Sequence, residues 1–184
     1  SSVGGRTQTT YLWAQDAWRF APRWQAVLGL RWEAWTAYDG YTGTASSAQT
    51  YARRRDAHAS PKAALAYQWE PGTVLKAALG RAVRYPTVGE LYGATSGGAL
   101  SFINDPNLQP EVSWTGELSL EKDLASAGAG LARATLFHET TRDALYSQLV
   151  PGTSISRVQN VDKVRTWGLA LAYSGPLPRL GRGL

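Results

Sequence analysis

Hydrophobic and polar side chains alternate along seven stretches of the 184-residue chain, which are separated by segments rich in Gly, Pro, Ser, Thr and Asp. Alternation with a period of two is typical of β-strands whose two faces meet different surroundings. In residues 25–38, for example, Ala26, Leu28 and Leu30 share one side and Arg31 lies on the other. The predicted strands are residues 10–20, 25–38, 60–69, 73–83, 113–121, 131–146 and 157–173. The pattern predicts an all-β protein.

The connections between these strands alternate in length. Short turns at residues 21–23, 70–72 and 123–130 alternate with long polar segments at 39–56, 85–111 and 147–156. In an antiparallel up-and-down sheet every second connection emerges at the same edge, so the long segments are predicted to share one rim. Outer-membrane β-barrels have this order, with short periplasmic turns and longer extracellular loops.

Strand length and aromatic content agree with a membrane barrel. About ten residues at about 3.3 Å each, tilted by about 40°, span about 25 Å, the height of the apolar band of such barrels. Eight Trp and nine Tyr residues suit the two membrane interfaces, where an apolar ring with a polar tip is stable. No apolar run is long enough for a transmembrane helix, so a spanning structure must be a closed barrel. Seven strands leave two open edges, which predicts a segment of a larger antiparallel up-and-down transmembrane β-barrel.

The longest connection lies within Gly80–Glu111 and is predicted to be a long surface loop. Pro86 follows a strand-like run and cannot donate to a ladder, so pairing is expected to stop there. Pro106 and Pro110 stand among Asn and Asp, which are turn formers. Residues 93–98 show no periodic apolar pattern. A loop of this length without structure of its own is usually functional or disordered.

Two parts of this stretch resemble the paired barrel motif of TonB-dependent outer-membrane receptors. They are GRAVRYPTVGELY at Gly80–Tyr92 and NDPNLQPE at Asn104–Glu111. The chain departs from the family pattern at Val83, which stands for Phe, at the inserted Asp105 and at Gln109, which stands for Lys. Further segments that are similar to the family follow in the usual order at residues 60–62, 134–137, 142–145 and 160–168.

The resemblance implies a function and a set of partners. Receptors of this kind have about 22 strands around a plug domain, so residues 1–184 are expected to be a partial barrel without the plug. With no signal peptide and no methionine, the chain is expected to be a processed or internal piece. The implied function is active import of a ferric siderophore or similar scarce metal chelate across the outer membrane of a Gram-negative bacterium. The implied partners are the TonB complex, reached through the absent plug, the chelate, and outer-membrane lipid and lipopolysaccharide.

Residues in the predicted extracellular loops are candidates for substrate binding. They are Tyr41, Tyr51, Arg53, Arg54, Arg55, Tyr92, Phe102 and Asn104. An arginine triplet beside tyrosines suits an anionic chelate, because Arg gives forked donors to carboxylates and stacks on rings. A solvated loop, or one that pairs with lipopolysaccharide phosphates, explains the same residues, and the sequence leaves both interpretations open.

The paired motif itself is expected to be structural, since by the resemblance it recurs in receptors for different substrates. Its residues are Arg81, Arg84, Pro86, Glu90, Leu91, Tyr92, Pro106, Asn107, Leu108, Pro110 and Glu111. Arg81, Arg84 and Glu90 are predicted to hold the loop or a plug by ion pairs. Glu117 and Glu121 share the luminal face of one strand and are expected to meet Lys or Arg on neighbouring strands or the plug.

Other chemistry finds little support in the sequence. The net charge of +5 comes without any nucleic-acid-binding motif, so no nucleic acid is predicted as a partner. The absence of Cys excludes disulfides and thiolate metal sites. His58 and His138 have no convergent partners nearby and are predicted to be surface or rim residues, with no metal, cofactor or catalytic residue. Without a nucleophile elbow the chain is not predicted to be an enzyme. The alternatives are a porin-like or structural barrel and a soluble β-rich binding domain.

Overall fold

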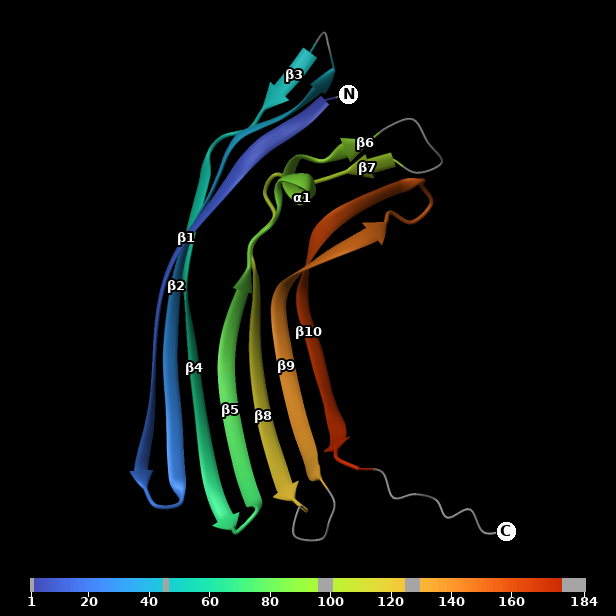
Figure 1. Cartoon of the computed structure of the whole chain (residues 1–184). Helices are drawn as coiled ribbons and strands as arrows, with labels where there is room; N and C mark the ends of the chain where they lie inside the picture. Colours follow the sequence, from blue (N-terminus) through green and yellow to red (C-terminus); the bar gives the residue numbers. More distant parts are fainter. Residues whose placement is uncertain (1, 45–46, 96–100, 125–129, 177–184) are drawn as a thin grey trace, which may run out of the picture.

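The computed structural model describes residues 2–44, 47–95, 101–124 and 130–176, with only the backbone at 44, 95 and 101–103. These residues form one curved sheet and one short helix (Figure 1). The seven long strands are β1 (Ser2–Ala21), β2 (Trp24–Thr44), β4 (Arg54–Glu70), β5 (Thr73–Arg84), β8 (Glu111–Asp123), β9 (Leu131–Leu149) and β10 (Ile155–Ser174). The short elements are β3 (Ser47–Thr50), α1 (Val88–Tyr92), β6 (Ala94–Thr95) and β7 (Ser101–Ile103). None of the described helices is long and apolar enough to cross a membrane.

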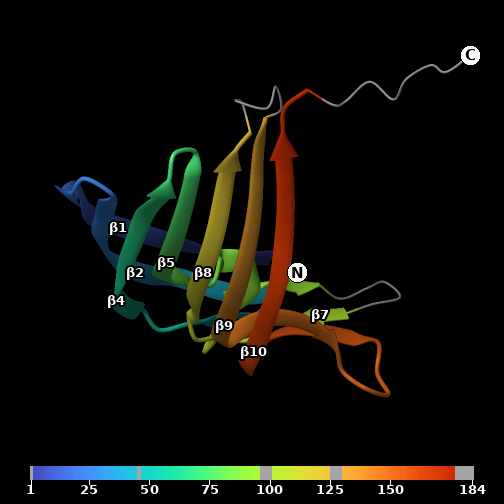
Figure 2. The ribbon, with the colours of Figure 1, turned by 90° about the horizontal axis from the view of Figure 1, so that it is seen from below.

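The long strands form an up-and-down meander in the order β1-β2-β4-β5-β8-β9-β10, each antiparallel to the next. The predicted all-β antiparallel fold is confirmed, and the sheet is open, as expected for a barrel segment. We call the end that carries α1, β6 and β7 the loop end, and the end with the β1–β2 and β4–β5 hairpins the turn end. β1 begins at the loop end and β10 ends at the turn end (Figure 1). Seen from below, β8, β9 and β10 run up the view while β1 and β2 run across it, so the sheet is twisted as well as curved (Figure 2).

The strand register gives the sheet one polar face and one apolar face. Leu79, Leu118, Leu136 and Leu169 lie on the convex face, and their exposed fractions range from 46% to 60%. Positions between these leucines on the same strands point to the concave face and include charged and polar side chains, such as Glu117 and Thr135, beside small ones such as Ala78. A sheet that exposes leucines on its outer side while keeping charges inside has the polarity of a membrane barrel rather than that of a water-soluble sheet.

The strands extend further toward the loop end than the apolar pattern predicts. β1 begins at Ser2, eight residues before the predicted strand at 10–20. The predicted polar segment 39–56 is largely a hairpin in which β3 pairs with β2. The connection at 147–156 is also shorter, because β9 reaches Leu149 and β10 begins at Ile155. Backbone pairing continues there without alternation of side chains, because these parts of the strands lie beyond the apolar band. The predicted turn at 123–130 lies largely outside the described residues.

The prediction of a long, unstructured surface loop at Gly80–Glu111 is wrong in two respects. The strand does end before Pro86, as predicted, but α1, β6 and β7 follow within the connection. The connection also contains side chains that are only 0–2% exposed, Leu91, Tyr92 and Leu108. The physical reason is that the chain turns back over the concave face at the loop end, where it is enclosed between the ends of β1–β2 and β9–β10 (Figure 1).

Candidate functional site

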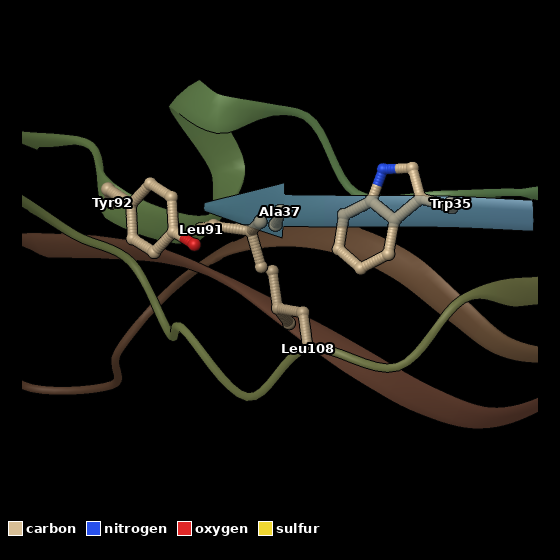
Figure 3. Close-up of a cluster of buried hydrophobic side chains, with 5 residues drawn as sticks. All are labelled: Trp35, Ala37, Leu91, Tyr92 and Leu108. Atoms are coloured by element: carbon tan, nitrogen blue, oxygen red, sulfur yellow. The ribbon is translucent and has the colours of Figure 1, made fainter. Parts of the chain in front are cut away.

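The hydrophobic core of the described structure lies at the loop end, inside the curve of the sheet. Trp35 and Ala37 of β2 are 2% and 0% exposed and contact Leu91, Tyr92 and Leu108 of the β5–β8 connection (Figure 3). Both halves of the paired motif therefore contribute to one cluster, although 16 positions separate Tyr92 from Leu108. Burying these side chains fixes the connection to the sheet, which we call the wall. Each large side chain contributes about 1.5–3 kcal/mol to stability.

Close packing around Tyr92 depends on glycines in the wall. A Cβ built on Gly40 would lie 2.4–2.7 Å from the ring atoms of Tyr92, and one built on Gly5 would lie 2.8 Å from them. The ring also stacks on Tyr51, with 5.1 Å between the centroids. Burial raises the pKa of the Tyr92 hydroxyl, and no described group hydrogen-bonds to it. The Tyr92 ring packs directly on the backbone of these glycines and so holds α1 against β1 and β2.

Helix α1 starts with a capping box. Thr87 Oγ1 accepts a hydrogen bond from the Glu90 N–H, and the Thr87 N–H donates to Glu90 Oε2 at 2.8 Å. Arg84 then pairs with Glu90, with 3.0 Å between Nη1 and Oε1. Burial would raise the pKa of Glu90, but the hydrogen bonds from Thr87 and Arg84 outweigh it and hold the pKa below its usual value. Sequence alone gave no helix here, although Thr87 and Glu90 have the spacing of a capping box.

The second half of the motif is held by side chains from distant strands. Arg54 of β4 donates to the carbonyl oxygens of Pro106 at 2.6 Å and Leu108 at 2.9 Å. Asn160 of β10 accepts from the Gln109 N–H at 2.8 Å and donates to the Gln109 carbonyl at 2.9 Å. The connection is thus tied to both sides of the sheet. Nothing in the sequence pattern indicated these partners.

The first half of the motif bridges a gap in the sheet. Pairing between β4 and β5 ends at Lys62 and Gly80, and toward the loop end the two strands diverge. Arg81 donates across the gap to the carbonyl of Ala59. The Tyr85 hydroxyl lies 3.2 Å from His58 Nδ1, and burial, with the nearby charges of Glu33 and Asp56, raises the pKa of Tyr85 to about 12. His58 is therefore a half-buried residue of β4 near the loop-end rim, and of the two predicted locations, surface or rim, the structure shows the rim.

The concave face carries ion pairs closer to the turn end. Glu121 of β8 lies between Lys76 of β5 and Arg133 of β9, with 2.6 Å between the charged atoms on each side. The expectation that Glu121 meets basic residues on neighbouring strands is confirmed. Glu117, two rows nearer the loop end, forms no ion pair with any described residue and lines a concave hollow of about 500 Å³ together with Lys62. The concave face as a whole is open and polar, and it carries charged side chains.

The profile of a protein family matches the chain over almost its whole length. The profile of the TonB dependent receptor-like, beta-barrel family covers residues 1–182. The chain belongs to this family. The membership predicted from the paired motif is confirmed, and the motif of this TonB-dependent receptor barrel is the connection that fills the loop end. Members of the family act as receptors in transport and not as enzymes.

Several known proteins are similar to this receptor barrel. It is 26% identical over 160 residues to the iron-regulated outer membrane virulence protein of Vibrio cholerae, covering 79% of this chain and 24% of that protein. The hemophore receptor HasR of Serratia marcescens has a TM-score of 0.74 at 16% identity, covering 91% of this chain and 31% of HasR. The copper transporter OprC gives 0.69 at 19% identity, covering 91% and 26% of the two chains. The receptor barrel spans about a quarter to a third of these relatives, and the structural matches show a shared fold.

In the receptor barrel, the residues predicted to bind substrate lie in two environments. Arg54, Tyr51 and Tyr92 belong to the packed loop end, and Asn104 donates to the Gly89 carbonyl. Arg53 lies over the Tyr38 ring at 5.3 Å, while Arg55 and Tyr41 are exposed. The side chain of Phe102 lies outside the described part of the structure. Arg54 and Arg55 begin β4 and point to opposite faces of it, so the arginine triplet is not one surface.

Proposed function

We propose that this barrel segment belongs to an outer-membrane receptor that imports a ferric siderophore or a similar scarce metal chelate. Family membership over residues 1–182 carries the proposal. The iron-regulated relative of Vibrio cholerae and the structural relatives HasR and OprC support uptake of a metal or metal-containing ligand as the general class. The location that follows is the outer membrane of a Gram-negative bacterium, crossed by many strands of a barrel of about 22 strands.

In this function the barrel does no bond chemistry and acts through its two faces. The concave face meets a plug domain outside residues 1–184, and its paired and free charges give that plug a polar surface on which to rearrange. Glu117 and Lys62, which line the same hollow, are the luminal positions that we assign to plug contact. Energy reaches the plug through the TonB complex. Because the paired motif is packed and internally bonded, it keeps the loop end rigid while the plug moves.

Ligand capture is assigned to side chains at the loop end that the packing leaves available. Arg53, Arg55 and Tyr41 are exposed there, and guanidinium groups suit the negative charge of ferric chelates. Arg54 is excluded from this role, since it holds the carbonyls of Pro106 and Leu108. The triplet therefore supplies two arginines to the ligand and one to the wall.

Uptake assays on the full-length receptor test the proposal. The gene is expressed in a Gram-negative host that lacks its own siderophore receptors, and accumulation of ⁵⁵Fe is measured from ferric enterobactin, ferric citrate and haemin. We expect uptake of at least one probe, lost when TonB is deleted. Replacing Arg53 and Arg55 with Ala is expected to weaken uptake at low probe concentration and to leave the amount of receptor in the outer membrane unchanged.

Two results would contradict this function. Passive uptake that persists without TonB indicates a porin-like barrel. A receptor that is folded and monomeric in buffer without detergent indicates a soluble β-rich domain, because the convex face exposes Trp167 to 80% and Leu171 to 74%. Apolar side chains exposed on that scale are stable in lipid and prone to aggregation in water.

A further inference from the structure

The concave face carries a basic hollow at the point where β4 and β5 diverge toward the loop end (Figure 1). The hollow has a volume of about 260 Å³, and its lining includes Trp13, Arg31, Ser60, Lys62 and Arg81. We propose that it binds carboxylate groups of the imported chelate, so that this receptor takes chelates with carboxylates that the metal leaves free. The proposal rests on the proposed function, which it deepens by naming a class of ligand.

Strand register places most of these residues side by side. Ser60 of β4 is opposite Arg31 of β2, and Arg31 is in turn opposite Trp13 of β1. Lys62 is two residues beyond Ser60 and shares its face, because alternate side chains of a strand point the same way. That face is the concave one, since Lys62 lines a hollow there together with Glu117. The basic hollow therefore opens into the lumen.

A glycine lets the Lys62 side chain lie flat on the sheet. Gly29 is opposite Lys62, and a Cβ built on it would lie 2.7 Å from Lys62 Cε and 2.9 Å from Lys62 Cγ. Lys62 is exposed and forms no hydrogen bond or ion pair with any described residue. It lines both the basic hollow and the hollow that it shares with Glu117, so the proposed ligand lies next to the surface assigned to the plug.

Arg31 is held in position by two neighbours. Its Nη2 lies 2.9 Å from Glu33 Oε1, and its Cζ lies 4.1 Å from the centre of the Tyr11 ring. A guanidinium has five N–H donors, so the contact with Glu33 leaves donors for a ligand. Arg81 lines the basic hollow from the β5 side and is fixed by its hydrogen bond to the Ala59 carbonyl. Both arginines are thus ordered before a ligand arrives.

The charge of the basic hollow favours an anion. Arg31, Lys62 and Arg81 are cations, and none of the described residues that line the hollow is acidic. Glu33 neutralises one of these three charges from a neighbouring position, so the hollow keeps an excess of positive charge. Cations in a concave site with protein walls attract an anion more strongly than the same charges do in open water.

The Ser60 hydroxyl is a second, independent indication of a ligand. Ser60 is 9% exposed and lines the basic hollow, and its Oγ has no hydrogen-bond partner among the described residues. Buried hydroxyls are normally hydrogen-bonded, as Ser119 on the same face illustrates, 2.8 Å from Thr135 Oγ1. A carboxylate oxygen in the hollow would accept the hydrogen bond that Ser60 otherwise lacks.

The lining suits an organic carboxylate. The guanidinium fork matches the two oxygens of a carboxylate, and Trp13, which is 62% exposed, gives an apolar ring on which the carbon skeleton can pack. In a tris-catecholate chelate the anionic oxygens are bound to the metal, so they are not free to form these contacts. Arg31 is four residues, or about 13 Å, from Trp35 toward the turn end. A ligand captured at the rim would therefore reach the basic hollow after it passes the packed loop end.

Ligand binding to the purified full-length receptor tests the assignment. Citrate, ferric citrate and ferric enterobactin are titrated by calorimetry, the last being a tris-catecholate without a carboxylate. We expect citrate to bind and to compete with ferric citrate. Ser60→Ala and Lys62→Gln are each expected to weaken the binding of citrate about tenfold, as the loss of one hydrogen bond to a charged group predicts.

Two variants serve as matched controls. Ser119→Ala removes a hydroxyl from the concave face away from the basic hollow, and Lys163→Gln removes an exposed cation from the convex face of β10. Both are expected to bind citrate as the unmodified receptor does. Ser60→Ala is expected to keep the unfolding midpoint of the ligand-free receptor, because its hydroxyl has no described partner to lose.

Several outcomes would overturn the assignment. They are the absence of citrate binding, equal binding of citrate by Ser60→Ala and Ser119→Ala, and binding of ferric enterobactin that depends on Ser60 to the same degree. A lower unfolding midpoint of ligand-free Ser60→Ala would also overturn it, since a part of the receptor outside residues 1–184 would then already occupy the basic hollow. TonB-dependent uptake of ⁵⁵Fe, measured separately, distinguishes the two proposals. Uptake without citrate binding contradicts this assignment alone, and citrate binding without TonB-dependent uptake contradicts the proposed function.

Discussion

Arg54 offers a direct test of how the paired motif is held. Its guanidinium donates to the Pro106 and Leu108 carbonyls at 2.6 and 2.9 Å, and its Cζ lies 5.8 Å from the centre of the Trp35 ring. A charged hydrogen bond contributes about 1.5–3 kcal/mol, and a cation–π contact at a solvated site about 0.5–1 kcal/mol. Because the side chain is half-buried, we expect Arg54→Ala to lower the opening free energy of the connection by about 2–4 kcal/mol.

Hydrogen exchange in the full-length receptor measures this opening locally. The Asn107 N–H donates to Asp105 Oδ1 and the Gln109 N–H to Asn160 Oδ1, so both amides are protected while the connection stays in place. A loss of about 2–4 kcal/mol corresponds to exchange that is about 30- to 1000-fold faster in peptides covering residues 105–111.

The neighbouring arginine provides the control. Arg55 is exposed and on the opposite face of the same strand, so Arg55→Ala is expected to leave exchange unchanged. Exchange in Arg54→Ala within twofold of the unmodified receptor would refute the reasoning, because the two carbonyl contacts would then contribute nothing to holding the connection. Equal acceleration in both variants would also refute it, since the effect would then follow net charge.

Two further predictions concern α1. Gly40→Ala places a methyl group against the Tyr92 ring and is expected to lower the free energy of unfolding by about 1–3 kcal/mol, the usual cost of overpacking. Gly80→Ala is the control, because the added methyl group meets only the Lys62 side chain, at 3.9 Å, and its effect is expected to be small. Thermal unfolding of both receptors checks this, and equal midpoints would contradict it. The pKa of Glu90 is below its usual value in the folded state, so its contribution is present above the usual pKa of about 4.5 and declines as pH falls through the folded pKa. Hydrogen exchange of α1 between pH 3 and pH 7 is expected to show this decline, and Glu90→Gln is expected to remove it.

How much the sequence could predict is clearest along β8. Trp114, Leu118 and Leu120 face away from Thr115 and Glu117, as their alternation predicts, and the strand lies where expected. The period of two is enough here because the two faces of a barrel strand meet lipid and a polar lumen. The same pattern fails at the loop end, where β2 and β4 continue through segments that read as polar loops. The strands extend beyond the membrane there and neither face contacts lipid, so apolar and polar side chains no longer need to alternate.

The candidate site shows the same division. The sequence singled out the paired motif and predicted that Arg81, Arg84 and Glu90 hold the loop or a plug by ion pairs. The structure contains the pair of Arg84 with Glu90 at 3.0 Å, whereas Arg81 donates to the Ala59 carbonyl. It gave no indication of Trp35 or Asn160 as partners of the motif. These residues are brought to it by pairing between strands that are far apart in sequence, so their role depends on register and not on local pattern.

The sequence by itself determined the class of the molecule: alternation, loop order and the paired motif specify antiparallel strands of a receptor barrel. Only the tertiary structure decided that the motif is buried, and that Arg54 supports the sheet while Arg55 faces outward. The physical reason is that a strand's own residues fix which of its faces is polar. Which residues of different strands become neighbours is fixed by the register between strands.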